Sequence, residues 1–287
     1  MTTSLTHGRH EITVDGVQQV YHVTGSGPIA VFHSGGPGID WRYLRMPALE
    51  EHLTAVYLEP VGTSDSGRLP THPAGYTIER YVRHLHGVVE ALGVPAVHVV
   101  GHSHGGFVAL QYALDHPERT AGLVLYSTSA YTGPEWGADL KDNLDAMVER
   151  FSDRPQMAAA RDALFAGHEP TDEAFTACLQ QALPAYFADY WAREEEWLPM
   201  RDAVRGYLVE SEWNGTFDVR ARLADIAART LILVGRHDFI CSPRWAGELH
   251  RGIAGAELVE FEGSGHFPHL EQPEAFTRAV ASFVTAG

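Results

Sequence analysis

The sequence predicts an α/β fold in which a mostly parallel β-sheet is flanked by helices on both faces and carries an inserted helical cap. Short apolar runs rich in β-branched residues alternate with segments of helical period along most of the 287 residues. Strands that alternate with helices pair in parallel, because each helix returns the chain to the same edge of the sheet. The alternation stops near residue 130 and resumes at residue 230, which indicates an insertion into one sheet.

The predicted sheet begins with a hairpin. Asp15-Gly16 separates two segments of alternating polarity, and this dipeptide favours the tight turn that joins antiparallel strands. Strands are predicted at residues 10–14, 18–23, 29–32, 55–58, 97–100, 123–126, 230–234 and 257–261. Helices are predicted at residues 41–53, 78–92, 107–114, 243–251 and 273–284, the first of them in spite of Pro47.

The motif G-x-S-x-G lies at residues 101–105, between a predicted strand and a predicted helix. In this context the serine occupies a sharp turn that exposes its hydroxyl above the edge of the sheet. Gly101 and Gly105 leave room for the turn, because a Cβ atom at either position would crowd the neighbouring backbone. Ser103 is therefore the candidate nucleophile, although the same pattern also occurs in glycine-rich turns that carry only a surface serine.

The inserted segment, residues 131–213, contains no convincing strand and twelve of the 29 aromatic residues. We expect it to be helical, with interruptions near Pro155, Pro170, Pro184 and Pro199. The predicted organisation is a core domain formed by residues 1–130 and 214–287, with residues 131–213 as the cap. A cap rich in aromatic side chains suits an apolar substrate, but any one of these side chains can equally belong to a small helical core.

Composition excludes several classes of function. The net charge of −16 argues against nucleic acid or an anionic membrane as a partner. No apolar run approaches a transmembrane length, and residues 1–16 lack the basic and apolar regions of a secretion signal. Cys178 and Cys241 are far apart and indicate no disulfide framework. We expect a cytoplasmic enzyme that acts on a small molecule, and a homodimer is compatible with the sequence.

A histidine and an aspartate accompany Ser103 in the order that a catalytic triad requires. Serine is a poor nucleophile until a base removes its proton, and the base needs a carboxylate to fix its tautomer. His266 follows the last predicted strand and Asp238 follows the strand before it. Because the carboxyl ends of parallel strands meet at one edge, we expect the three side chains to lie together. Alone, Asp238 could cap a helix and His266 could be a surface histidine.

Two backbone N–H groups are candidates for an oxyanion hole. The glycine-rich loop at residues 33–38, HSGGPG, leaves a predicted strand, and Gly35 is the expected donor within it. The second donor is the N–H of His104, at the start of a helix. His102 and His104 flank Ser103, but no nearby cysteine or carboxylate completes a ligand set, so we expect no metal and no cofactor.

Five segments carry a family resemblance: residues 33–38 (HSGGPG), 59–63 (EPVGT), 101–106 (GHSHGG), 235–238 (GRHD) and 265–266 (GH). Together they resemble the proline iminopeptidase branch of the α/β-hydrolase superfamily, along the whole chain outside the cap. The resemblance implies the α/β-hydrolase fold. It also implies that Ser103, Asp238 and His266 form the triad and that the glycine loop supplies the oxyanion site.

The sequence departs from this branch where the substrate would be recognised. The family loop usually reads HGGPG, and Ser34 replaces its histidine; residues 59–62 replace the family's DQRG. Family peptidases hold the free amine of their substrate with cap glutamates and with an acid near the triad aspartate. Glu212 is the one candidate here, and the neighbours of Asp238 are not acidic. A single carboxylate holds a buried ammonium group weakly.

We therefore expect a serine hydrolase that cleaves the ester or lactone bond of a small apolar molecule. Within the branch, the sequence is similar to bacterial lactonases that open polyketide macrolactones such as zearalenone. The residues expected around the substrate are Gly36, Trp191, Glu212, Trp213 and Phe239. Three alternative hypotheses for the function stay open: a proline iminopeptidase-type aminopeptidase, a non-catalytic binding protein on a hydrolase fold, and a carbon–carbon bond hydrolase or cofactor-free cyclase.

Overall fold

The computed structural model describes residues 5–210 and 217–286, and within these ranges eight strands form one sheet. The strand order is β1-β2-β4-β3-β5-β6-β7-β8. β1 pairs antiparallel with β2 and β2 with β4, whereas every later pair is parallel. The strands are β1 (Gly8–Val14), β2 (Val17–Gly25), β3 (Ile29–His33), β4 (Thr54–Leu58), β5 (Val97–His102), β6 (Thr120–Tyr126), β7 (Thr230–Gly235) and β8 (Glu257–Phe261). The predicted fold class is confirmed.

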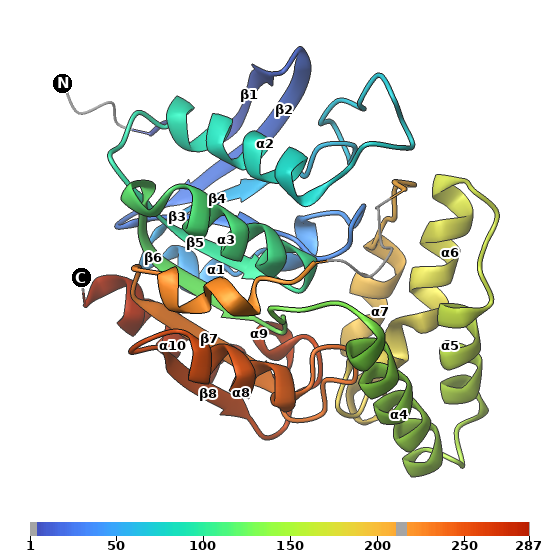
Figure 1. Ribbon diagram of the computed structural model, residues 1–287. Helices are drawn as coiled ribbons and strands as arrows, with labels where there is room; N and C mark the ends of the chain where they lie inside the picture. Colours follow the sequence, from blue (N-terminus) through green and yellow to red (C-terminus); the bar gives the residue numbers. More distant parts are fainter. Residues whose placement is uncertain (1–4, 211–216, 287) are drawn as a thin grey trace.

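Helices cover both faces of the sheet (Figure 1). α2 (Ile78–Ala91), α3 (His104–Asp115) and α8 (Pro243–Gly252) pack on one face. α1 (Pro47–Glu50) and α10 (Pro273–Thr285) pack on the other, next to the short α9 (Pro268–Glu271). The central strands are buried on both sides, which is why their sequences are continuously apolar.

The segment predicted as one long helix at residues 41–53 is broken in the structure, so that prediction is wrong. A 3-10 turn at Arg42–Leu44 is followed by extended backbone at Arg45, and α1 begins only at Pro47. Proline disfavours helical backbone at the residue before it and cannot donate the N–H that a helix interior requires. The break leaves Tyr43 on a short turn beside the glycine-rich loop.

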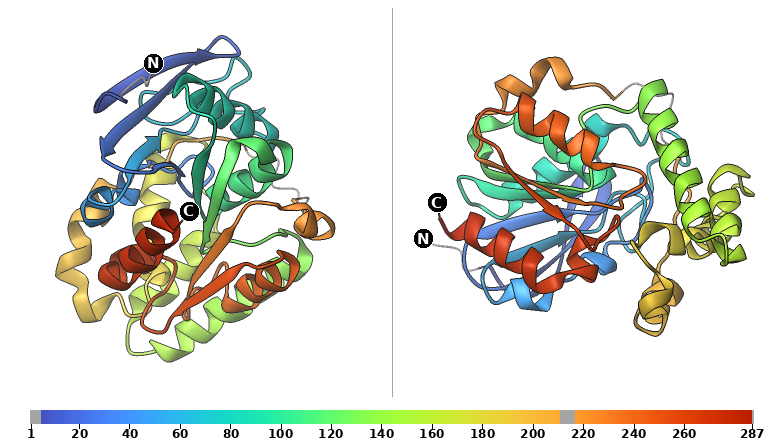
Figure 2. Two further views of the ribbon diagram at one scale, coloured as in Figure 1. Left: turned by 90° about the vertical axis from the view of Figure 1, so that its left-hand side faces the viewer. Right: turned by 90° about the horizontal axis from the view of Figure 1, so that it is seen from below.

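Between β6 and β7 the chain forms α4 (Pro134–Arg150), α5 (Pro155–Phe165), α6 (Asp172–Ala182) and α7 (Glu194–Ala203). The right-hand view of Figure 2 shows these helices gathered at one side of the sheet. The interruption expected near Pro199 is absent, because α7 continues through this residue. Pro199 and Glu195, whose carbonyl loses its helical donor, are both exposed, so water can satisfy that oxygen.

Candidate active site

Ser103 lies on a strained turn between β5 and α3. Its backbone has φ 52° and ψ −121°, a region that side chains other than glycine rarely adopt. The flanking glycines make the turn sterically feasible. A Cβ on Gly101 would lie 2.4 Å from the Gly105 carbonyl oxygen, and one on Gly105 would lie 2.2 Å from the His33 carbonyl oxygen. The motif therefore requires glycine at both positions for the steric reason that the sequence suggests.

His266 and Asp238 form a buried, hydrogen-bonded pair. Asp238 follows β7 and His266 follows β8, and His266 Nδ1 lies 2.8 Å from Asp238 Oδ2. The other carboxylate oxygen, Oδ1, accepts hydrogen bonds from the N–H groups of Ile240 at 3.0 Å and Cys241 at 2.9 Å. These contacts fix the carboxylate and stabilise its negative charge. The carboxylate in turn holds the proton of His266 on Nδ1 and leaves Nε2 as the basic nitrogen.

Ser103 and His266 face the same cavity, which has a volume of about 340 Å³. Among the described residues, no hydrogen bond joins the Ser103 hydroxyl to His266 Nε2. Helices α4–α7 supply much of the apolar wall, with Trp136, Leu140, Leu164, Phe165, Leu179, Met200 and their neighbours. No Asp, Glu, Lys or Arg side chain of the described part of the chain lines the cavity. The cavity can therefore hold an uncharged, apolar molecule against Ser103.

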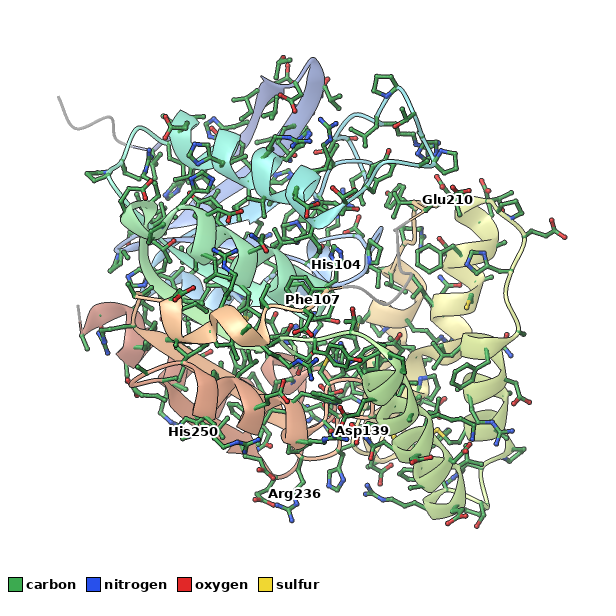
Figure 3. All side chains as sticks on the ribbon, viewed as in Figure 1. His104, Phe107, Asp139, Glu210, Arg236 and His250 are labelled. Atoms are coloured by element: carbon green, nitrogen blue, oxygen red, sulfur yellow. The ribbon has the colours of Figure 1, made fainter. Side chains whose placement is uncertain are left out.

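The two expected oxyanion donors lie at this site, but in different states. Figure 3 shows His104 and Phe107 at the end of α3 that faces α4–α7. The N–H of His104 belongs to the first turn of α3 and donates to no acceptor within the described residues. The N–H of Gly35 already donates to the Tyr43 hydroxyl, at 2.7 Å. No sequence motif marks Tyr43, which lies within the segment predicted as one long helix.

Only some of the residues expected around the substrate line the cavity in the described part of the chain. Gly36 and Phe239 line the cavity. Trp191 does not line it; its ring packs on Phe151, with a centroid distance of 5.3 Å. Glu212 and Trp213 lie outside the described residues. The cavity also takes in Trp136 from α4 and Phe267, the residue after His266, which no sequence motif marked.

The structure offers no grouping for a metal ion within the residues that it describes. His102 contacts Tyr43 and Tyr126, whereas His104 packs against Tyr81. Burial lowers the pKa of His104 to about 3 and that of His102 well below its ordinary value, so both imidazoles are neutral. Among the described residues, no helix combines the length and apolar character that crossing a membrane demands.

Comparison with known proteins decides the family. A family model described as alpha/beta hydrolase fold matches residues 28–273. The chain belongs to this family. It is 28% identical over 285 residues to 2-hydroxy-6-oxo-2,4-heptadienoate hydrolase of Pseudomonas putida, covering 96% of this chain and 95% of that protein. It is 25% identical over 280 residues to proline iminopeptidase of Heyndrickxia coagulans, covering 91% and 92%.

Among solved structures, the chain is similar to the enol-lactonase of Burkholderia xenovorans LB400. The TM-score is 0.71 and the sequence identity 27%, with 96% of this chain and all of that chain covered (100%). The family resemblance inferred from the motifs is confirmed, since both an iminopeptidase and a lactonase are among its relatives. The chain is an enzyme of the hydrolase class on the alpha/beta hydrolase fold.

Proposed function

We propose that this enzyme is a cofactor-independent serine hydrolase that cleaves the ester or lactone bond of a small, uncharged apolar molecule, such as a polyketide-type lactone. The observation that carries the proposal is that Ser103 and His266, whose ring is hydrogen-bonded to Asp238, line one cavity whose described walls hold no Asp, Glu, Lys or Arg side chain. Helices α4–α7 act as the cap that encloses the substrate.

The proposed reaction has two halves. Ser103 Oγ attacks the carbonyl carbon while His266 Nε2 accepts its proton, and Asp238 stabilises the imidazolium that forms. The alkoxide leaves with that proton; in a lactone it stays attached to the acyl chain as a hydroxyl. Water then attacks the acyl-enzyme with His266 again as base, and Ser103 regains its proton as the acid is released.

Among the described residues, no Asp, Glu, Lys or Arg side chain lines the cavity, and this favours an ester or lactone over two alternatives. A peptidase that recognises a free ammonium group needs a carboxylate in its pocket, and the candidate, Glu212, lies outside the described residues. A dienoate substrate, as in the name of the Pseudomonas putida relative, carries a carboxylate that needs a cation. An unpaired charge in an apolar cavity costs several kcal/mol (roughly 2 or more). The enol-lactonase among the structural relatives supports a lactone.

A parallel assay tests the proposal. The purified enzyme is offered p-nitrophenyl butyrate, a macrocyclic lactone, a proline arylamide with a free amine, and a 2-hydroxy-6-oxo-dienoate. We expect turnover of the ester or lactone and its loss in Ser103→Ala, with the thermal unfolding temperature retained. Preferred turnover of the arylamide, lost on Glu212→Ala, would make the enzyme a peptidase. Preferred turnover of the dienoate would make it a carbon–carbon bond hydrolase.

A fluorophosphonate probe distinguishes the enzyme from a binding protein on the same fold. The probe reacts only with a serine whose hydroxyl is activated, so we expect it to label wild-type protein at Ser103. Ser103→Ala and His266→Ala should remain unlabelled. Absence of label on the folded wild-type protein, together with no turnover of any of the four substrates, would contradict the catalytic proposal.

A further inference from the structure

Three hydrogen bonds connect the glycine-rich loop, the residue before the nucleophile and the backbone of His266. The N–H of Gly35 donates to Tyr43 Oη at 2.7 Å, Tyr43 Oη lies 2.6 Å from His102 Nδ1, and His102 Nε2 lies 3.0 Å from the His266 carbonyl oxygen. A carbonyl oxygen can only accept, so His102 Nε2 carries the hydrogen. Because His102 is neutral, its Nδ1 is an acceptor, and Tyr43 must donate to it.

The Tyr43 hydroxyl lies beside the glycine-rich loop and close to the nucleophile. A Cβ built on Gly35 would be 3.1 Å from Tyr43 Oη, 3.2 Å from His102 Nδ1 and 3.2 Å from Ser103 Cβ. Tyr43, Ser103 and His266 all line the same cavity. Burial raises the pKa of Tyr43 far above its ordinary value, so the hydroxyl keeps its proton and can donate it in a hydrogen bond.

The geometry points to Tyr43 as a catalytic residue: its hydroxyl is a side-chain donor to the oxyanion, beside the N–H of His104. This inference rests on the proposed serine hydrolase function. As Ser103 attacks, the hydroxyl hydrogen turns from His102 Nδ1 to the substrate oxygen, with the O–H bond intact and no proton transferred. The oxyanion is the stronger acceptor of the two, because it is charged.

Gly35 then acts through Tyr43. Its N–H donates into a lone pair of Tyr43 Oη, which polarises the hydroxyl and strengthens the hydrogen bond that the hydroxyl donates. His102 holds the hydroxyl in place before the substrate arrives, and its own orientation is fixed by the His266 carbonyl. The alternative is that Tyr43 only accepts the hydrogen bond from the N–H of Gly35 and so keeps this N–H from the oxyanion. Removal of the hydroxyl would then leave the Gly35 N–H free to donate to the oxyanion.

Tyr43→Phe separates these two roles. The ring is retained, so its packing against Phe267 and His269 is preserved. We expect kcat for p-nitrophenyl butyrate to fall about 10²- to 10³-fold, with KM changed only a few-fold, as for loss of one oxyanion donor. An aryl trifluoromethyl ketone, which adds to the serine as a tetrahedral oxyanion, should lose affinity by a similar factor.

Tyr126→Phe is the matched control. Tyr126 is buried and its ring lies 4.5 Å from that of His102, yet its hydroxyl has no hydrogen-bond partner among the described residues, and it does not line the cavity. This variant should keep wild-type kcat and ketone affinity. Unchanged or increased kcat in Tyr43→Phe, with Ser103→Ala inactive, would overturn the role of Tyr43 and leave the serine hydrolase intact. Full activity in Ser103→Ala would overturn the proposed function itself.

Discussion

Glu271 Oε2 accepts a hydrogen bond from the N–H of Gly265, the residue before His266, at 2.7 Å. Its other oxygen, Oε1, accepts from the N–H of Ala188 at 2.8 Å. Ala188 belongs to the segment between α6 and α7, so this carboxylate joins the helical insertion between β6 and β7 to the loop that carries His266. A second contact has the same effect, since the N–H of His266 donates to the Tyr186 carbonyl oxygen at 2.7 Å.

Glu271 should make stability depend on pH. Burial raises its pKa from 4.5 to about 7. The folded protein therefore binds this proton more tightly than the unfolded chain, and the free energy of unfolding falls as pH rises from about 4.5 to 7. Glu271→Gln has no carboxyl to titrate, so this contribution disappears in the variant. Between pH 5 and pH 8 the unfolding equilibrium constant of the wild type should therefore rise, relative to that of the variant, by a factor of about ten or more.

Urea denaturation at several pH values measures this effect. Glu274→Gln is the control, because Glu274 is exposed on α10 and its contact with Arg278 is long, at 3.9 Å. Its stability should follow that of the wild type at every pH. Parallel curves for Glu271→Gln and the wild type would show that the Glu271 carboxyl titrates at its ordinary pKa.

Asp238→Asn should reduce kcat by roughly 10³- to 10⁴-fold while the protein stays folded. The amide can still accept from Ile240 and Cys241, but it no longer stabilises the imidazolium and it favours the wrong tautomer of His266. Asp139→Asn is the matched control: Asp139, labelled on α4 in Figure 3, accepts from Ser242 and Trp245 at 2.7 and 2.9 Å. That variant should lose stability and keep kcat within a few-fold. Steady-state kinetics and thermal unfolding of both variants measure these effects. If Asp139→Asn lowered kcat and Asp238→Asn did not, Asp238 would not be the acid of the triad.

Gly38→Ala should disturb the glycine-rich loop. Gly38 has φ +78°, and an added Cβ would lie 2.2 Å from the Tyr207 carbonyl oxygen. The N–H of Tyr207 also donates to the Gly38 carbonyl, at 2.7 Å, so the two backbones are held in close contact. We expect a loss of about 1–3 kcal/mol in the free energy of unfolding, and lower kcat because Gly35 and Gly36 shift with the loop.

Gly137→Ala is the control for that substitution. Gly137 is exposed within α4, and nothing lies within 4 Å of an added Cβ. Alanine is the better helix former, so this change should raise the free energy of unfolding by about 0.5–1 kcal/mol and leave kcat unchanged. Equal effects of the two substitutions would contradict the steric argument for Gly38.

The sequence predicts the fold and the order of the candidate residues because those signals are local. The central strands are apolar runs, and Ser103, Asp238 and His266 each lie in the turn or loop after a parallel strand, so parallel pairing alone brings their backbones to one edge. The hydrogen-bond partner of the Gly35 N–H, by contrast, comes from outside the glycine-rich loop. Tyr43 reaches Gly35 across 8 residues and His102 across 59, and no pattern within a single segment reports such contacts.

The sequence also does not predict which side chains of the helical insertion point into the cavity. Trp191 and Trp136 are both aromatic residues of that segment, yet only Trp136 lines the cavity. Trp191 lies on a three-residue 3-10 turn, too short to have a periodic apolar face, and the guanidinium of Arg154 lies 5.8 Å from its ring centroid. Which aromatic faces the substrate is decided by how the helices pack on one another.

The described wall of the cavity holds no Asp, Glu, Lys or Arg side chain, which predicts discrimination between neutral and anionic substrates. p-Nitrophenyl hexanoate and the p-nitrophenyl half-ester of adipic acid have acyl chains of equal carbon number, but the second ends in a carboxylate. Burying that carboxylate without a cation should lower kcat/KM by roughly 100-fold, since each 1.4 kcal/mol is a factor of ten. Leu164→Arg places a guanidinium at a half-buried position of the wall. This variant should reduce the ratio of kcat/KM for the neutral ester to kcat/KM for the anionic ester by about tenfold. If the wild type hydrolysed both esters equally well, the acyl chain would have to bind outside this cavity.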